Sequence, residues 1–191
     1  MKTGIRALVN KDTKKLTAND QEKAEVLAKQ FASVMVKEPE GDTPKLTPRT
    51  LLTAPLSSIV ITEEMVSKKL KNLDASKSPG PDDIHPRELK DTAPAIVPAL
   101  ALLFNESLKT HSMPDDWKSG VITAIFKKGD KSDPGNYRPV SLTCIICKIL
   151  ESIIFDFIIK HLRKNKLLSK SQYGFISKRS ASLQLLTVLE F

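Results

Sequence analysis

The sequence predicts an α+β fold that is mostly helical and carries a single β-hairpin. Two short runs rich in β-branched residues, 121–126 and 140–142, flank a turn-rich segment that contains Asp133-Pro134-Gly135-Asn136. Elsewhere apolar residues recur at intervals of three and four, the spacing of one face of an α-helix. A chain of 191 residues, 40% of them hydrophobic, can bury one core of ordinary size.

The hairpin brings basic side chains to the ends of its strands. Pro134 and Gly135 suit the central positions of a type II turn. Because side chains alternate along a strand, Lys127 and Lys128 are expected on opposite faces, and Arg138 of the returning strand close to one of them. Adjacent cations repel each other unless an anion joins them, so the pattern favours a phosphate group as their partner.

Two helix starts carry capping signals. Asn19 with Glu22 three places on resembles a capping box and precedes a helix that is expected to end near Lys37. Thr62 is expected to cap the first turn of a second helix. Between them, residues 38–50 are rich in proline and charge and predict a linker, so we place a boundary there.

Residues 86–109 predict one or two helices before the hairpin. Pro94 and Pro98 imply a break or a kink, because proline lacks the amide hydrogen that a helix interior needs. Trp117, the only tryptophan, follows shortly afterwards. We interpret Trp117 as a core anchor beneath the sheet rather than as a base-stacking residue.

The strongest helical pattern follows the hairpin. Apolar residues recur at three and four over residues 142–163, and Asp156 can pair with Lys160 one turn on. A last apolar helical pattern covers residues 183–189 and stops at the end of the sequence without a capping residue, which predicts that the chain continues in a longer protein.

Charge and cysteine content narrow the classes of partner. The net charge is +8, and residues 120–191 hold 12 basic and 5 acidic residues, which favours a nucleic-acid or nucleotide partner for that third.

Cys144 and Cys147 have no further ligand at zinc spacing and are expected to be buried apolar residues. The adjacent Asp82 and Asp83 lack a third metal ligand, so no metal site is predicted. No apolar stretch has the length of a membrane span or signal peptide, which predicts an intracellular protein without a membrane partner.

Six motifs occur in a specific order. They are KSPGPDDI at 77–84, Pro-x-x-Trp-Lys at 114–118, IFKKGDKSDPGNYRPVSL at 125–142, KILE at 148–151, QYGF at 172–175 and Arg179-Ser180. Through them, residues 77–191 resemble the N-terminal part of the reverse transcriptase domain of non-LTR retrotransposons, with the jockey-like branch as the nearest match. Residues 1–50 more weakly resemble the segment that joins the endonuclease and polymerase domains of such elements.

The resemblance implies the fingers and the start of the palm of a right-hand polymerase. Residues 1–50 would be a helical lead-in and linker, and residues 51–191 a partial reverse transcriptase domain. Arg138 would be the leading ligand of the incoming nucleotide's triphosphate, with Lys127 or Lys128 as the second. Five further residues would lie near the template: Gln172, Gly174, Phe175, Arg179 and Ser180.

Three positions depart from the family's pattern. Asp83 stands where the family usually has glycine, Ile176 replaces a basic residue and Ala181 replaces a hydroxyl-bearing one. The change at Ile176 puts a template contact at that position in doubt.

The resemblance also implies chemistry that other residues would perform. Polymerases of this kind hold two Mg²⁺ ions on palm carboxylates, and no Tyr-x-Asp-Asp or Phe-x-Asp-Asp occurs in the sequence. We therefore expect a C-terminally truncated fragment with no catalytic or metal-binding residue, inactive alone without the remaining palm and thumb. Its expected partners are an RNA template, a DNA primer and a deoxynucleoside triphosphate (dNTP). The alternative is a non-catalytic nucleic-acid-binding remnant of a retroelement.

Overall fold

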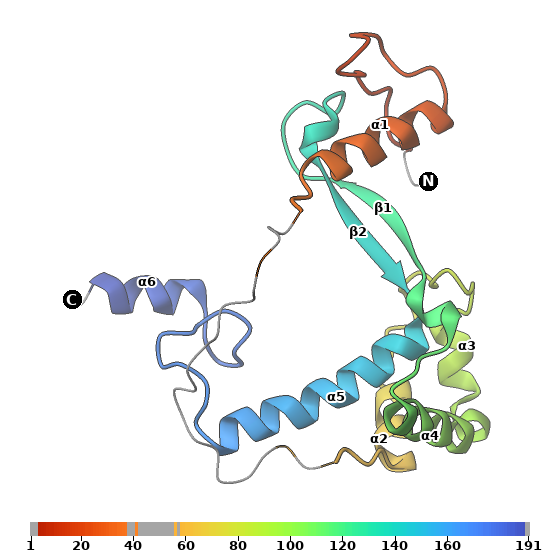
Figure 1. Ribbon diagram of the computed structural model, residues 1–191, viewed down its shortest axis with the longest axis vertical. Helices are drawn as coiled ribbons and strands as arrows, with labels where there is room; N and C mark the ends of the chain where they lie inside the picture. Colours follow the sequence, from red (N-terminus) through yellow and green to blue (C-terminus); the bar gives the residue numbers. More distant parts are fainter. Residues whose placement is uncertain (1–3, 38–40, 42–55, 57, 190–191) are drawn as a thin grey trace. The chain divides into compact units, whose positions relative to one another are not determined.

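The computed structural model describes residues 4–37, 41, 56 and 58–189, and within them it contains six α-helices and one two-stranded antiparallel sheet (Figure 1). The predicted α+β class is confirmed. The predicted linker at 38–50 lies outside the described residues except for Gly41. The chain divides into two compact units. The hairpin unit consists of residues 1–44, 73–91 and 113–147, and the helical unit of residues 45–72, 92–112 and 148–191.

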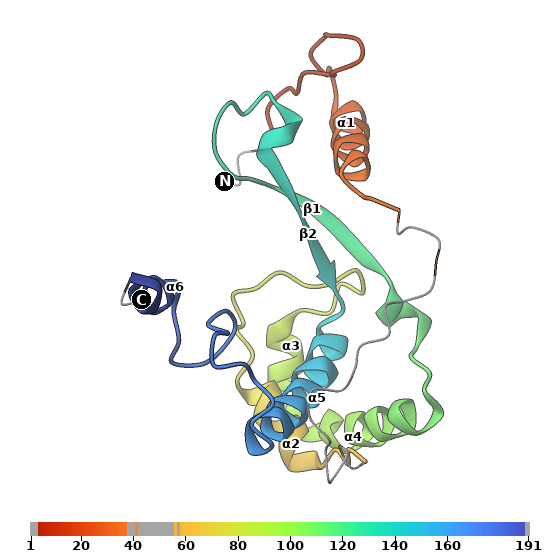
Figure 2. The same ribbon diagram turned by 60° about the vertical axis from the view of Figure 1, so that its left-hand side comes forward.

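The hairpin unit is built on strands β1 (Gly120–Phe126) and β2 (Tyr137–Thr143). Helix α1 (Asp20–Ser33) lies beside the loop end of this hairpin, as Figures 1 and 2 both show. The buried side chains that join helix and hairpin are Leu8, Leu27, Phe31 and Tyr137. The N-terminal segment therefore packs against one face of the hairpin.

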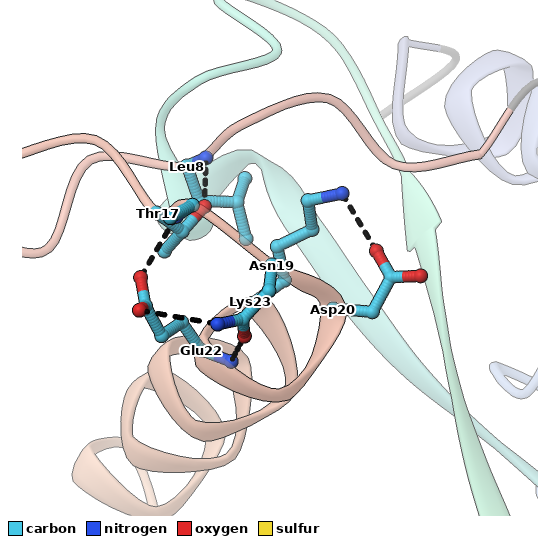
Figure 3. A network of polar contacts seen from close by, with 7 residues as sticks. Leu8, Thr17, Asn19, Asp20, Glu22 and Lys23 are labelled. Carbon is cyan, nitrogen blue, oxygen red and sulfur yellow. Dashed lines mark hydrogen bonds and ion pairs between the residues drawn. The ribbon is translucent and has the colours of Figure 1, made fainter.

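The start of α1 has the predicted capping box (Figure 3). Asn19 Oδ1 accepts a hydrogen bond from the Glu22 amide at 2.9 Å, and the Glu22 carboxylate accepts one from the Ala18 amide at 2.8 Å. The Leu8 amide donates to Thr17 Oγ1 at 2.9 Å, which ties the preceding loop to the cap. The helix ends at Ser33 rather than near Lys37, and Val34 to Val36 are exposed.

Two short helices and a tight loop complete the hairpin unit. They are α3 (Pro86–Asp91) and the 3₁₀ helix η1 (Asp115–Lys118), which contains the buried Trp117. The burial of Trp117 confirms its predicted role as a core residue. The loop before α3 packs closely on β2, because a Cβ atom on Gly80 would lie 2.8 Å from the Thr143 carbonyl oxygen.

The helical unit begins with α2 (Glu63–Lys71) packed against α4 (Ala93–Thr110). The Thr62 hydroxyl accepts from the Met65 amide at 3.3 Å, as predicted for the cap. The Asn105 side chain of α4 makes two hydrogen bonds to the backbone of Ile61. Its Oδ1 accepts from the Ile61 amide at 2.9 Å, and its Nδ2 donates to the Ile61 carbonyl at 2.7 Å. This long-range clamp fixes the entry into α2.

The predicted break between helices lies at Thr92, between the end of α3 and the start of α4. Pro94 lies in the first turn of α4, where its missing amide hydrogen costs nothing. Pro98 lies inside α4 without ending it.

Helix α5 (Ile145–Lys164) and helix α6 (Ala181–Leu189) follow the hairpin. The helix predicted from residue 142 begins three residues later, because Leu142 belongs to β2 and pairs with Val121. None of the described α6 side chains is buried. Among the described residues, no helix combines the length and the apolar character that crossing a membrane requires.

The predicted pairing of Asp156 with Lys160 is wrong. The Asp156 carboxylate instead binds the Lys69 ammonium group of α2 at 2.6 Å, and Lys69 also donates to Ser152 Oγ at 2.7 Å. The contact between helices is favoured because the Lys69 ammonium group donates to Asp156 and Ser152 at once. Periodicity along a single helix gives no sign of such a partner.

Candidate functional site

The register of the hairpin decides which side chains share a face. Ile125 pairs with Arg138, and Phe126 pairs with Tyr137. The Lys127 amide donates to the Asn136 carbonyl at 2.8 Å, which continues the ladder by one position beyond β1. Since side chains alternate along a strand, Lys127 lies on the face of Ile125 and Arg138. The sequence leaves open which of the two lysines lies beside Arg138. The register of the hairpin places Lys127 there.

The opposite face of the hairpin is anchored. Phe126 and Tyr137 meet edge to face with 5.6 Å between ring centroids, and Tyr137 is 8% exposed. Phe126 and Ala124 pack against the cluster that Tyr137 shares with Leu27 and other residues of the N-terminal segment. Because this face is covered, Lys127 and Arg138 are left on the solvent side.

The loop that joins the strands is held by its own polar groups. The Asp133 carboxylate accepts from the Gly135 amide at 2.8 Å, and the Asn136 amide nitrogen Nδ2 donates to the Asp130 carbonyl at 2.9 Å. Gly129 has a φ of +91°, and a Cβ atom there would lie 2.7 Å from Asn136 Nδ2. The positive φ therefore favours glycine at Gly129, and a larger residue would also displace the Asn136 amide group.

The predicted type II turn is wrong. Residues Pro134–Asn136 form the 3₁₀ helix η2. A type II turn needs a positive φ at its third residue, and Gly135 does not have one. The Asp133 side chain, by binding the Gly135 amide, stabilises the 3₁₀ geometry instead.

The three predicted triphosphate ligands are all exposed. Lys127, Lys128 and Arg138 have no ion-pair partner within the part of the chain that the structure describes. Sequence reasoning missed a fourth basic side chain, Lys131, whose ammonium group lies 5.5 Å from the centre of the Phe126 ring. The spacing of the loop residues carries no signal of this cation–π contact.

The predicted template residues lie in one loop of the helical unit and at the start of α6. Arg179 Nη1 donates to the carbonyls of Lys170 and Gln172 at 2.7 and 2.5 Å, and its guanidinium group lies 5.0 Å from the Tyr173 ring centre. These contacts fold the loop that contains Gly174. The arginine therefore binds the loop itself through this nitrogen.

Phe175 and Ser180 have different surroundings. Phe175 is fully exposed and has a φ of +61°, an uncommon backbone conformation for an aromatic residue. Ser180 Oγ accepts from the Leu183 amide at 3.2 Å and so serves at the start of α6. The five predicted template residues are already close together in the sequence, and among them Phe175 is displayed to solvent.

The histidine, cysteine and acidic side chains of the described residues do not converge on one point. Within the described residues, no three His, Cys, Asp or Glu side chains are grouped so that they could hold one metal ion. Cys144 and Cys147 are buried free thiols, and burial, with a further contribution from the Asp82 carboxylate, raises the pKa of Cys144. The Mg²⁺ ions that the resemblance implies do not fit a donor set in this part of the chain.

The sequence is similar to proteins encoded by mobile elements. No family model matches. The RNA-directed DNA polymerase from mobile element jockey of Drosophila melanogaster is 31% identical over 141 residues, which are 73% of this chain. The probable RNA-directed DNA polymerase from transposon BS of the same organism is 31% identical over 59% of this chain. This chain is related to the RNA-directed DNA polymerases of jockey-like mobile elements. The resemblance predicted from its motifs is confirmed.

The relatives are much longer than the similar segment. The alignments span 15% of the jockey polymerase and 12% of the transposon BS protein. A Pol polyprotein from the type-1 retrotransposable element R1 of Bradysia coprophila is 33% identical over 47% of this chain and 9% of its own length. The chain therefore corresponds to a small part of each relative.

The relationship gives meaning to one departure from the family's pattern. Asp83, which the resemblance places at a glycine position of the family's pattern, has a φ of +55°. This left-handed conformation favours glycine and is tolerated by aspartate and asparagine better than by most other residues. Asp83 therefore adopts a backbone conformation in which glycine would be unstrained.

Proposed function

We propose that this chain is the part of a jockey-like reverse transcriptase that holds the triphosphate of the incoming dNTP and contacts the RNA template. In this proposal it forms the fingers and the start of the palm of a right-hand polymerase. The observation that carries the proposal is the pair of exposed cations, Lys127 and Arg138, on one face of a hairpin whose other face is anchored. The similarity to RNA-directed DNA polymerases supplies the class of ligand.

The chemistry of the two side chains suits a triphosphate. Arg138 presents a planar fork of donors that can bind two phosphate oxygens at once, and Lys127 supplies a compact point charge. An anion bound between them would relieve the repulsion of two neighbouring cations. The anchored face holds the strands in register, so the two groups remain together without the ligand.

The proposed template contacts belong to the segment of Gln172 to Ser180. Phe175 displays a fully exposed ring, which suits stacking on a base. The DNA primer and the catalytic carboxylates with their Mg²⁺ ions are assigned to the remainder of the polymerase. Residues 51–191 are accordingly proposed to be part of its reverse transcriptase domain.

Binding of a fluorescent dNTP to the purified chain tests the proposal. We expect saturable binding that unlabelled dNTP and inorganic triphosphate displace and that the corresponding nucleoside does not. Displacement by the nucleoside, or no binding, would contradict the triphosphate role. In a primer-extension assay on an RNA template the chain alone should incorporate nothing, and Mg²⁺-dependent incorporation would show that it holds its own catalytic groups.

The non-catalytic nucleic-acid-binding remnant is a second candidate, favoured by the same exposed cations. It predicts salt-sensitive binding of oligonucleotides without selective binding of dNTP. The dNTP assay therefore separates the two candidates.

A further inference from the structure

We propose a second anion-binding site, in the helical unit, that takes the phosphodiester backbone of a nucleic-acid strand. The site is a groove of about 260 Å³ between α2 and α5. Lys68 and Lys160 lie on its rim, from α2 and α5 respectively. Both are exposed, and neither has an ion-pair partner among the residues that the structure describes.

The groove has more lysine ammonium groups than carboxylates to pair with them. Asp156 is the only carboxylate among the described residues that line the groove, and this group already binds Lys69 at 2.6 Å. Lys69 in turn gives its remaining hydrogen bonds to Ser152. The ammonium groups of Lys68 and Lys160 donate only, so the ligand that completes the rim must supply acceptors and negative charge.

The surroundings strengthen the positive field at the rim. The last turn of α2 contains Lys68, Lys69 and Lys71, and the last turn of α5 contains His161, Arg163 and Lys164. Basic residues at helix C-termini also offset the helix dipole, which is a structural reason for their presence. That reason does not explain why Lys68 and Lys160 line one groove.

The floor of the groove selects among anions. Met65, Ile153 and Phe157 line it with apolar and aromatic surface. A free phosphate would leave this surface uncovered, whereas a nucleic-acid strand brings sugar and base faces together with its phosphates. The groove therefore fits a nucleic-acid strand better than an isolated anion.

This inference rests on the proposed function for its class of partner, but it concerns residues far from the hairpin in sequence. It adds Lys68 and Lys160 to the residues that bind nucleic acid. It also assigns a role to α2, for which none of the sequence motifs predicts one.

The test is the salt dependence of binding of a fluorescent 20-nucleotide single-stranded RNA to the purified 191-residue chain. Each phosphate contact on a single strand contributes about 0.7 to the slope of log K against log salt concentration. The Lys68→Gln, Lys160→Gln double variant should lower the slope by about 1.4. The matched control, Lys37→Gln with Lys109→Gln, removes the same charge elsewhere and should change the slope by much less.

A second measurement does not depend on substitutions. Lysine acetylation of the wild-type chain with and without the RNA should show Lys68 and Lys160 protected by the bound strand and Lys109 modified equally in both samples. Equal slopes for the double variant and the control, absence of RNA binding, or no protection would each overturn the inference. Binding of an acidic apolar peptide that the RNA does not displace would overturn it as well.

Measuring dNTP binding in a hairpin variant distinguishes failure of this inference from failure of the proposed function. If Arg138→Gln lowers dNTP affinity while the groove variant leaves the RNA slope unchanged, the groove is not a nucleic-acid site and the proposed function stands. If Arg138→Gln has no effect on dNTP affinity, the proposed function fails, and the RNA slope still decides the groove by itself.

Discussion

The Phe126 and Tyr137 rings meet edge to face across the hairpin, with 5.6 Å between their centroids. They are directly paired in the sheet and lie on the face that packs against the N-terminal segment. Packing of Tyr137 against Leu8, Leu27 and Phe31 covers this face of the hairpin. Alternation along the paired strands places Lys127 and Arg138 on the opposite face.

The Tyr137 hydroxyl should contribute to the stability of the hairpin loop. It donates to the Lys131 carbonyl at 2.7 Å, and a hydrogen bond of this kind is worth about 1 kcal/mol. Tyr137→Phe should lower the free energy of unfolding by about this amount in urea titrations. Tyr173→Phe is the control, since the Tyr173 hydroxyl is exposed in its contact with Thr187 and its loss should matter less. Equal effects of the two changes would contradict the role of this partly buried hydrogen bond.

The same residue should make stability depend on alkaline pH. Burial raises the pKa of Tyr137 above its ordinary value of about 10. A raised pKa in the folded state means that the unfolded chain loses the proton first, so stability is complete below pH 10 and falls as the pH rises toward the folded-state value. Tyr137→Phe should flatten the fall in stability above pH 10, measured by urea midpoints. An unchanged slope would show that Tyr137 does not titrate differently in the two states.

The close approach of Gly80 to β2 gives a steric prediction. A Cβ atom at this position would lie 2.8 Å from the Thr143 carbonyl oxygen and 3.0 Å from Cys144 Cα, which are backbone atoms that cannot rotate away. Gly80→Ala should therefore destabilise the chain by about 1–3 kcal/mol in urea titrations. Gly4→Ala serves as the control, because no atom lies within 4 Å of a Cβ there. If both variants unfold at the same urea concentration, the packing at Gly80 is looser than described.

Local signals in the sequence predicted much of the fold correctly. The Asn19–Glu22 capping box, the Thr62 cap and the two strands all depend on residues close together in the chain. Their geometry follows from a few side-chain hydrogen bonds and from alternation, so short patterns are enough to predict them.

Contacts between distant residues could not be predicted in this way. The clamp of Asn105 on Ile61 spans 44 positions and the pairing of Lys69 with Asp156 spans 87. Neither follows from a periodic pattern. In the candidate site, the sequence indicated the three cations, while the register and the packing of the N-terminal segment were needed to show which of them share an open face.

Arg179 should act on its loop rather than only as a positive charge. Its Nη1 donates to the carbonyls of Lys170 and Gln172, which a lysine cannot reproduce with the same geometry. In Arg179→Lys, hydrogen exchange of the amides of residues 169–176 should quicken by about fivefold, as expected when about 1 kcal/mol of local stability is lost. Lys178→Gln, which removes a neighbouring charge, should leave exchange near the wild-type rate. Unchanged exchange in Arg179→Lys would mean that the loop does not depend on the guanidinium group.

The central claim is that Lys127 and Arg138 bind the same triphosphate group. The most direct test is dNTP affinity in the Lys127→Gln, Arg138→Gln and Lys128→Gln variants, because all three remove one exposed charge and only the first two change the shared face. Charge-assisted hydrogen bonds to phosphate predict about a tenfold loss for Lys127→Gln and at least as much for Arg138→Gln. Lys128→Gln should cost less than about twofold, the size of a general charge effect. Equal losses in all three variants, or none in any, would contradict the account.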